Sequence, residues 1–290
     1  AWFFAWVFFT ALTGVFDFLL ADAYVTQKLA ISLRTSMVFF ALNFIAVATI
    51  IYVLLRYSIQ EKLKIQERLE EAHQLLQVEK FRSEKLLLNV LPAAVAQRLK
   101  TSAATIADGF PAATVMFADL VNFTRVASHM TPEQVFGMLN SIFSAFDDLC
   151  ERFGLEKIKT IGDAYMAAGG INSNNEDHAA AIADFALAMQ AVLHRDYQIN
   201  AAHMQIRVGI ATGPVVAGVV GKHKFIYDVW GDTVNLASRI TSEGSPGSIH
   251  CDAATQARLA PQFAFEGPFS INLKGKGDMT VFRLLGRQTG

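Results

Sequence analysis

Apolar residues are distributed unevenly along this chain of 290 residues. Residues 1–57 are strongly apolar, residues 58–100 carry many charges in a helical pattern, and residues 101–290 have the mixed composition of a globular domain. The third region is long enough to bury a hydrophobic core of its own. The pattern therefore predicts a transmembrane region, a cytosolic linker helix and a folded domain, in that order.

Two stretches of the first region are long enough to cross a bilayer. Residues 37–57 contain about 20 mostly apolar residues, the length that an α-helix needs to span the hydrocarbon core. Residues 1–20 are similar, with Asp17 near one end. A buried helix of a soluble protein is the alternative for residues 37–57, and the scarcity of polar residues disfavours it.

The orientation in the membrane follows from basic residues that come at the end of the second stretch. These residues are Arg56, Lys62, Lys64 and Arg68. By the positive-inside rule they place this end of the helix in the cytoplasm. We therefore expect a multi-pass protein of the cell membrane, in contact with lipid, whose folded domain lies in the cytoplasm.

Residues 58–90 contain neither glycine nor proline and are rich in Glu, Gln, Lys and Leu, which favours a helix. Apolar residues recur in it at alternating spacings of three and four: Ile65, Leu69, Ala72, Leu76, Leu86 and Val90. This spacing predicts a parallel coiled coil and hence a dimer. A single solvated helix is the alternative, because Glu79 and Ser83 interrupt the seam. Pro92 then stops or kinks the helix.

From residue 101 onward, short apolar runs alternate with longer helical ones. The sequence predicts strands at 113–118, 155–161, 164–168 and 206–211, and helices at 131–153, 176–193 and 232–240. Thr131 and Pro132 are typical of a helix start, and Gly154 of a helix end. Gly162 and Asp163 form the turn of a predicted hairpin. This order of elements indicates the α+β class.

Composition narrows the possible partners. The net charge of −1 and the absence of a Lys/Arg-rich run give no reason to expect a nucleic acid as partner. Cys150 and Cys251 lack metal-ligand spacing and are expected to be reduced thiols of a cytosolic domain. The seven histidines show no ligand spacing either, so none is assigned to a metal.

Two aspartates are placed where strands end. Asp119 follows the first predicted strand, and Asp163 lies at the tip of the hairpin. Each alone is typical of a helix cap or a turn. Where two neighbouring strand ends each present a carboxylate, hard divalent cations can bind, with phosphate oxygens as further ligands.

Three sequence blocks resemble the signature blocks of class III adenylyl and guanylyl cyclases, in the same order. They are FADLVNFT from Phe117 to Thr124, KIKTIGDAYM from Lys157 to Met166, and YDVWGDTVNLASR from Tyr227 to Arg239. With the membrane region and linker helix, the chain resembles mycobacterial membrane-anchored adenylyl cyclases, which are similar to the mammalian membrane enzymes. The resemblance implies a ferredoxin-like, palm-type catalytic domain at 101–290.

The resemblance also implies a reaction, in which the 3′-hydroxyl of a nucleotide attacks its own α-phosphate and pyrophosphate leaves. Two Mg²⁺ or Mn²⁺ ions would be held by Asp119 and Asp163, with the main-chain carbonyl of Leu120 as an additional ligand. Main-chain N–H groups of Asn122, Phe123 and Thr124 would receive the triphosphate. Lys274 or Lys276 would reach the terminal phosphates, and Lys274 is the preferred candidate.

Lys159 and Asp228 are the residues that the resemblance assigns to base recognition. Adenine offers an acceptor at N1 and a donor at its 6-amino group, which suits a lysine and an aspartate. Guanylyl cyclases typically carry Glu- and Cys-type residues at these places. ATP is therefore the expected substrate, and the reaction product is cyclic AMP.

Asn235 and Arg239 lie four residues apart and so share one face of the third helix. The resemblance implies that Asn235 orients the ribose and that Arg239 stabilises the charge on the α-phosphate. The chain departs from many relatives at Pro214, where they carry a phosphate-binding arginine.

In this family one catalytic domain supplies the metal ligands and another the groups that contact base, ribose and phosphate. Because this chain carries both sets, we expect a homodimer with two equivalent shared sites, paired through the linker helix and the catalytic domains. The alternatives are a guanylate cyclase of the same fold and a catalytically silent membrane signalling receptor.

Overall fold

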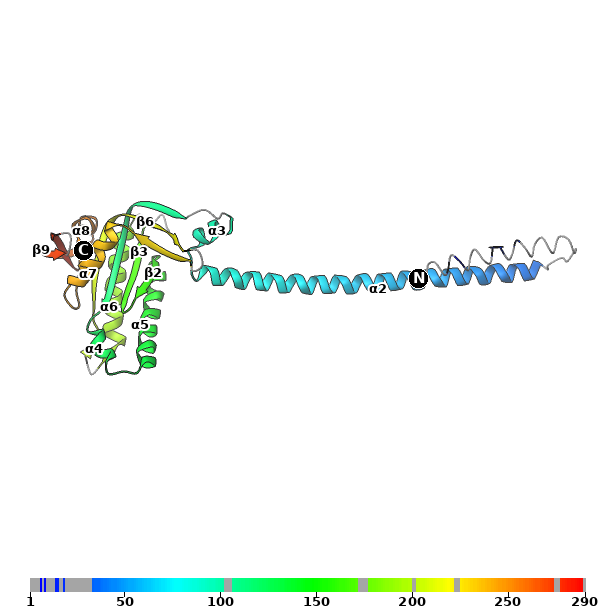
Figure 1. The fold of residues 1–290 in the computed structure, drawn as a ribbon, viewed down its shortest axis with the longest axis horizontal. Coiled ribbons are helices and arrows are strands. Elements are labelled where there is room, and N and C mark those ends of the chain that lie inside the picture. Colours follow the sequence, from blue (N-terminus) through cyan, green and yellow to red (C-terminus); the bar gives the residue numbers. More distant parts are fainter. Residues whose placement is uncertain are drawn as a thin grey trace. The chain divides into compact units, whose positions relative to one another are not determined.

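The computed structural model describes most of the chain (Figure 1). The described residues are 33–101, 106–171, 177–199, 202–221, 225–273 and 277–288, with isolated positions before residue 33. The first predicted membrane span, at 1–20, therefore lies largely outside the described residues, as do Lys274 and Lys276. The chain forms two compact units, Ala1–Arg82 and Ser83–Gly290.

One long helix, α2 (Leu33–Leu88), contains the second predicted span and most of the predicted linker helix. Among the described residues, one helical stretch, Phe40–Leu88, is long and apolar enough to cross a membrane. Aliphatic and aromatic side chains along it, such as those of Phe40 and Phe44, are exposed. The structure thus confirms the helix. That it crosses a bilayer remains a prediction.

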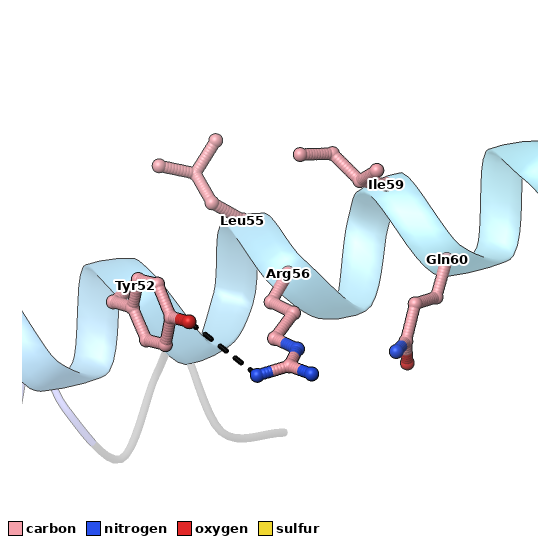
Figure 2. Close-up of a pocket in the computed structure, with 5 residues that line it drawn as sticks. All are labelled: Tyr52, Leu55, Arg56, Ile59 and Gln60. Carbon is pink, nitrogen blue, oxygen red and sulfur yellow. Dashed lines mark hydrogen bonds between the residues drawn. The ribbon is translucent and has the colours of Figure 1, made fainter.

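Figure 2 shows the end of the apolar stretch of α2. Arg56 donates a hydrogen bond from Nη1 to the hydroxyl of Tyr52, over 3.4 Å. Leu55, Ile59 and Gln60 lie around this pair along the same helix. A tyrosine next to an arginine is typical of the boundary between hydrocarbon and water.

The second unit is built on a mixed, largely antiparallel sheet of eight strands. Their order is β2-β3-β1-β6-β8-β10-β9, and β7 pairs with β6. The strands are β1 (Ala107–Leu120), β2 (Glu156–Ile161), β3 (Ala164–Gly169), β6 (Ile206–Val220), β7 (Ile226–Trp230), β8 (Ile249–Asp252), β9 (Phe263–Leu273) and β10 (Gly277–Arg287). A separate small hairpin is formed by β4 (Gln198–Ile199) and β5 (Ala202–His203).

Helices cover both faces of this sheet. They are α3 (Ala93–Thr101), α4 (Phe123–Ala127), α5 (Pro132–Arg152), α6 (His178–Asp196), α7 (Asp232–Glu243) and α8 (Ala253–Leu259). Met116, Ala118 and Leu120 of β1 face a core that includes α5 and α6, which pack on each other. Val115 and Phe117 face a second core, which includes α3 and α7. We call these the α5/α6 core and the α7 core.

The structure confirms the α+β class and most of the predicted elements. Helix α5 begins with a capping box between Thr131 and Gln134, and the hairpin β2–β3 turns at Gly162, whose φ is +62°. β1 and β6 are longer than predicted, and β7 to β10 and α8 were not predicted. The strands β7 and β8 are only five and four residues long. In β9 and β10, Gly267, Pro268 and Gly286 interrupt the alternation of apolar and polar residues, so the sequence signal for a strand is weak there.

Candidate active site

The two predicted metal ligands lie on neighbouring strand ends. Asp119 is paired with Ala164 across β1 and β3, and Asp163 directly precedes β3. The main-chain N–H of Leu120 donates to the carbonyl of Asp163 over 3.4 Å, which ties the two ends together. Since side chains alternate along a strand, Asp119 lies on the same face as Phe117, toward the α7 core.

The charge at this sheet end fits a cation. Burial raises the pKa of Asp163, and the negative charge of Asp119 raises it further, while its own main chain and Arg207 act in the opposite sense. Carboxylates that crowd each other in this way are stabilised by a divalent ion. The described residues hold no cluster of three His, Cys, Asp or Glu side chains, so water or substrate oxygens would complete the coordination. The side chain of Leu120 is buried in the α5/α6 core and carries no ligand atom, so only its main-chain carbonyl could coordinate an ion.

Arg207 is a site residue that the sequence reasoning missed. Its Nε donates to Oδ2 of Asp119 over 2.7 Å, and its Nη2 lies 2.6 Å from the same oxygen. Nη1 donates to the carbonyl of Ser242, at the end of α7, over 3.1 Å. The available signal was a single charge in the otherwise apolar run of β6, opposite Asp119 in the strand register.

Lys159 and Asp228 come together as an ion pair between β2 and β7. The side chain of Asp228 is 11% exposed and that of Lys159 is 36% exposed. The second carboxylate oxygen of Asp228 accepts a hydrogen bond from the N–H of Val229 over 2.8 Å. A donor and an acceptor therefore stand side by side at the surface of the sheet, on strands that are far apart in the sequence.

Helix α7 packs tightly on the sheet through one face. A Cβ atom at Gly209 would lie 2.5 Å from the carbonyl of Ala237 and from the main-chain nitrogen of Thr241, so only glycine fits there. Thr241 also donates from Oγ1 to the carbonyl of Phe117 over 3.2 Å. These contacts lay α7 over β1 and β6, with Ser242 near Arg207 and Thr233 near Pro214.

Asn235 and Arg239 lie on the opposite side of α7. The buried residues of the helix are Thr233, Leu236, Ala237, Ile240 and Thr241. With 3.6 residues per turn, Asn235 and Arg239 point away from this set, and Asn235 is exposed. Both side chains therefore lie on a different face of α7 from the one that packs on β1 and β6.

The segment predicted to receive the triphosphate follows β1 directly. Asn122 adopts a left-handed conformation, with φ of 59°, and α4 begins at the next residue. The carbonyl of Asn122 accepts hydrogen bonds from the N–H groups of Arg125 and Val126. The N–H groups of Phe123 and Thr124 belong to the first turn, where a helix leaves its donors unused. Asn122 and Thr124 are exposed.

Comparison with known proteins identifies the family of this domain. Residues 106–286 match the family described as the adenylate and guanylate cyclase catalytic domain. The chain belongs to this family. The match begins where β1 begins and ends in β10, so the cyclase domain includes every strand of the sheet and all the residues of the site discussed above.

Relatives of both nucleotide specificities are similar to this cyclase chain. An adenylate cyclase of Mycobacterium bovis is 45% identical over 218 residues, which are 75% of this chain and 49% of that protein. The guanylate cyclase soluble subunit beta-2 of Rattus norvegicus is 40% identical over 78% of this chain and 33% of its own length. The chain thus spans half or less of the length of these curated relatives.

Solved structures agree on the cyclase fold. The guanylate cyclase domain of RhGC from Catenaria anguillulae, in complex with GTP, superposes with a TM-score of 0.60 at 31% identity. It covers 62% of this chain and 100% of that domain. Because adenylate and guanylate cyclases are both similar to this chain, overall similarity does not show whether the chain prefers ATP or GTP. This preference has to be argued from the residues that would contact the base.

Proposed function

We propose that this cyclase is a membrane-anchored adenylate cyclase, which converts ATP into 3′,5′-cyclic AMP and pyrophosphate. The observation that carries the choice of ATP is the pairing of Lys159 with Asp228. A lysine can donate to N1 of adenine, and an aspartate can accept from its 6-amino group. Guanine presents a donor and an acceptor in the reverse order, so it would leave both side chains mismatched, which is costly at a partly buried site.

Asp119 and Asp163, with the carbonyl of Leu120, are proposed to hold two Mg²⁺ or Mn²⁺ ions. The ions, when bound, would activate the 3′-hydroxyl and neutralise charge at the α-phosphate. The closeness of two carboxylates at one sheet end, of which Asp163 has a raised pKa, supports this assignment.

The remaining groups bind and orient the nucleotide. Asn235 is proposed to hold the ribose, and Arg239 to offer its planar set of donors to the charge that grows on the α-phosphate. The N–H groups of Asn122, Phe123 and Thr124 would bind the triphosphate, where α4 begins. Lys274 is proposed to contact the terminal phosphates and lies outside the described residues.

A homodimer with shared sites explains why the two sets of groups face different ways. Asn235 and Arg239 point outward from α7, whereas Asp119 lies on the sheet that α7 covers. The hairpin of β6 and β7 also exposes apolar side chains on the face that carries Asp228: Val216, Val220, Ile226 and Trp230. A second chain that covered this hairpin would bring its own carboxylates to the base-binding groups.

The membrane part of the proposal rests on α2. We retain the division into a transmembrane region at 1–57, a linker helix at 58–100 and a catalytic domain at 101–290. The apolar stretch with its terminal tyrosine–arginine pair supports a span. The exposed leucines further along α2 support a coiled-coil pairing of two linker helices. In the cell this arrangement anchors the catalytic domain on the cytoplasmic side.

The test is an assay of the full chain in lipid nanodiscs with ATP or GTP and either Mg²⁺ or Mn²⁺. We expect cyclic AMP from ATP at a kcat/KM well above that for GTP, and no product from the Asp119→Asn variant. A preference for GTP would identify a guanylate cyclase instead. No product from either nucleotide would favour a silent signalling receptor.

A further inference from the structure

Arg207 contacts the carboxylate that is assigned to metal binding. Two of its nitrogens, Nε and Nη2, reach the same oxygen of Asp119 at 2.7 and 2.6 Å. The side chains are 36% and 19% exposed, so water screens this pair only in part. Hydrogen bonds from a charged guanidinium to a charged carboxylate are among the strongest that protein side chains form.

The guanidinium is also anchored on a second element. Nη1 donates to the carbonyl of Ser242, in the last turn of α7. Carbonyls in the last turn of a helix have no partner within the helix and carry the negative end of its dipole. Arg207 therefore keeps a hydrogen-bond acceptor on α7 when Asp119 releases it to coordinate a metal ion.

We propose that Arg207 is a resident counter-charge that a divalent ion must displace from Asp119, and that it thereby sets the metal affinity of the site. The inference rests on the proposed function, because it takes Asp119 and Asp163 as the metal ligands. In the absence of metal, Arg207 compensates the repulsion between the two carboxylates. When metal is abundant, an oxygen engaged by two N–H groups has to be released before it can coordinate the ion.

The size of the effect follows from the exposure of the pair. Separating a partly exposed ion pair costs about 1 kcal/mol, which corresponds to roughly a fivefold change in an equilibrium constant. Removing the guanidinium should therefore tighten metal binding by roughly fivefold, and the direction is opposite to that expected for a residue that helps to hold the metal.

The experiment measures Mn²⁺ binding by electron paramagnetic resonance to the full chain in lipid nanodiscs, with no nucleotide present. We expect Arg207→Gln to bind Mn²⁺ roughly fivefold more tightly than the wild type. Arg207→Lys keeps the charge but loses the double contact, so a smaller gain is expected, and it also serves if the glutamine variant does not fold. Arg195→Gln is the matched control, because the side chain of Arg195 is 75% exposed and, within the part of the chain that the structure describes, forms its ion pair with the neighbouring Asp196.

Asp119→Asn separates the two levels of the proposal. If it leaves Mn²⁺ binding unchanged, the metal site itself is wrong. If it abolishes binding while both Arg207 variants bind Mn²⁺ no more tightly than the wild type, the counter-charge role is overturned and the proposed function stands. Tighter binding in the Arg207 variants, with Arg195→Gln unchanged, supports the inference.

Discussion

Asp228 lies on β7 between two core residues, Tyr227 and Val229, and its carboxylate is largely removed from water. A buried carboxylate must be satisfied by hydrogen bonds or by an opposite charge. Asp228 receives both, from the N–H of Val229 and from Lys159. Its partner lies 69 residues away in the sequence, so the contact could be expected only through the family resemblance.

Reversing the donor and the acceptor should reverse the base preference. The double variant Lys159→Glu with Asp228→Cys presents an acceptor and a weak donor, which suits guanine. We expect the ratio of kcat/KM for ATP to that for GTP to fall by roughly 10- to 100-fold, since one mismatched buried polar group costs about 1–3 kcal/mol.

The matched control is Lys157→Glu on the same strand. Lys157 pairs instead with Asp147 of α5, on the other side of the sheet. This variant should change the ATP to GTP ratio little. A double variant with the wild-type ratio would contradict the assignment of Lys159 and Asp228 to the base.

His178 gives a prediction about pH and stability. Its ring is buried, with Nδ1 2.8 Å from the hydroxyl of Thr114. Burial lowers the pKa of His178 below 6.5, the charge of Arg258 lowers it further, and Asp177 acts in the opposite sense. Below pH 6.5 the unfolded chain therefore takes up a proton that the folded chain does not. As the pH is lowered below 6.5, the free energy of unfolding should therefore decrease, by up to about 1.4 kcal/mol per pH unit from this one group.

The His178→Gln variant should remove this part of the pH dependence. Glutamine can still meet Thr114 but does not titrate. Thermal unfolding of the full chain at pH 7.5 and pH 5.5 would measure the difference, with the exposed His129→Gln as control. If the wild type and His178→Gln lose the same stability on acidification, burial of the neutral ring is not the cause.

At the scale of elements, the position of α7 depends on the absence of a side chain at Gly209. Gly209→Ala would force a Cβ atom to within 2.5 Å of the carbonyl of Ala237. Overpacking of this kind costs about 1–3 kcal/mol, and any shift of α7 moves Asn235 and Arg239. We therefore expect a lower melting temperature and a lower kcat. Gly109→Ala, where a Cβ meets nothing within 4 Å, should change neither.

Elements with strong local signals could be predicted from the sequence, and others could not. The capping box at Thr131 and the left-handed Gly162 are local features, and the structure places α5 and the β2–β3 hairpin where they predict them. By contrast, β9 and β10 are mutual partners at the end of the sheet, and their residues alternate only weakly. The role of Arg207 depends on cross-strand register, which no local pattern encodes.

At the scale of the whole molecule, one chain carries both proposed sets of site residues but orients them in two directions. Asp119 and Asp163 lie at a sheet end, and Arg239 projects from the outer side of α7. The motifs identify these residues, yet only the packing of α7 on β6 reveals that they diverge. This divergence is what a shared site in a dimer requires.

Complementation tests this requirement directly. In the proposed site, Asp119→Ala would remove a metal ligand and Arg239→Ala would remove the cation that stabilises the α-phosphate, so each homodimer should be inactive. In a mixed dimer, one site would carry both lesions and the other would carry neither. With random pairing, half of the dimers are mixed and each has one intact site, so co-expression should recover about a quarter of the wild-type activity. Purification through two different tags would isolate the mixed dimers and raise the recovery to about half. Inactive mixed dimers would mean that each chain completes its own site, and α7 would then have to turn its outer face toward the carboxylates during the reaction.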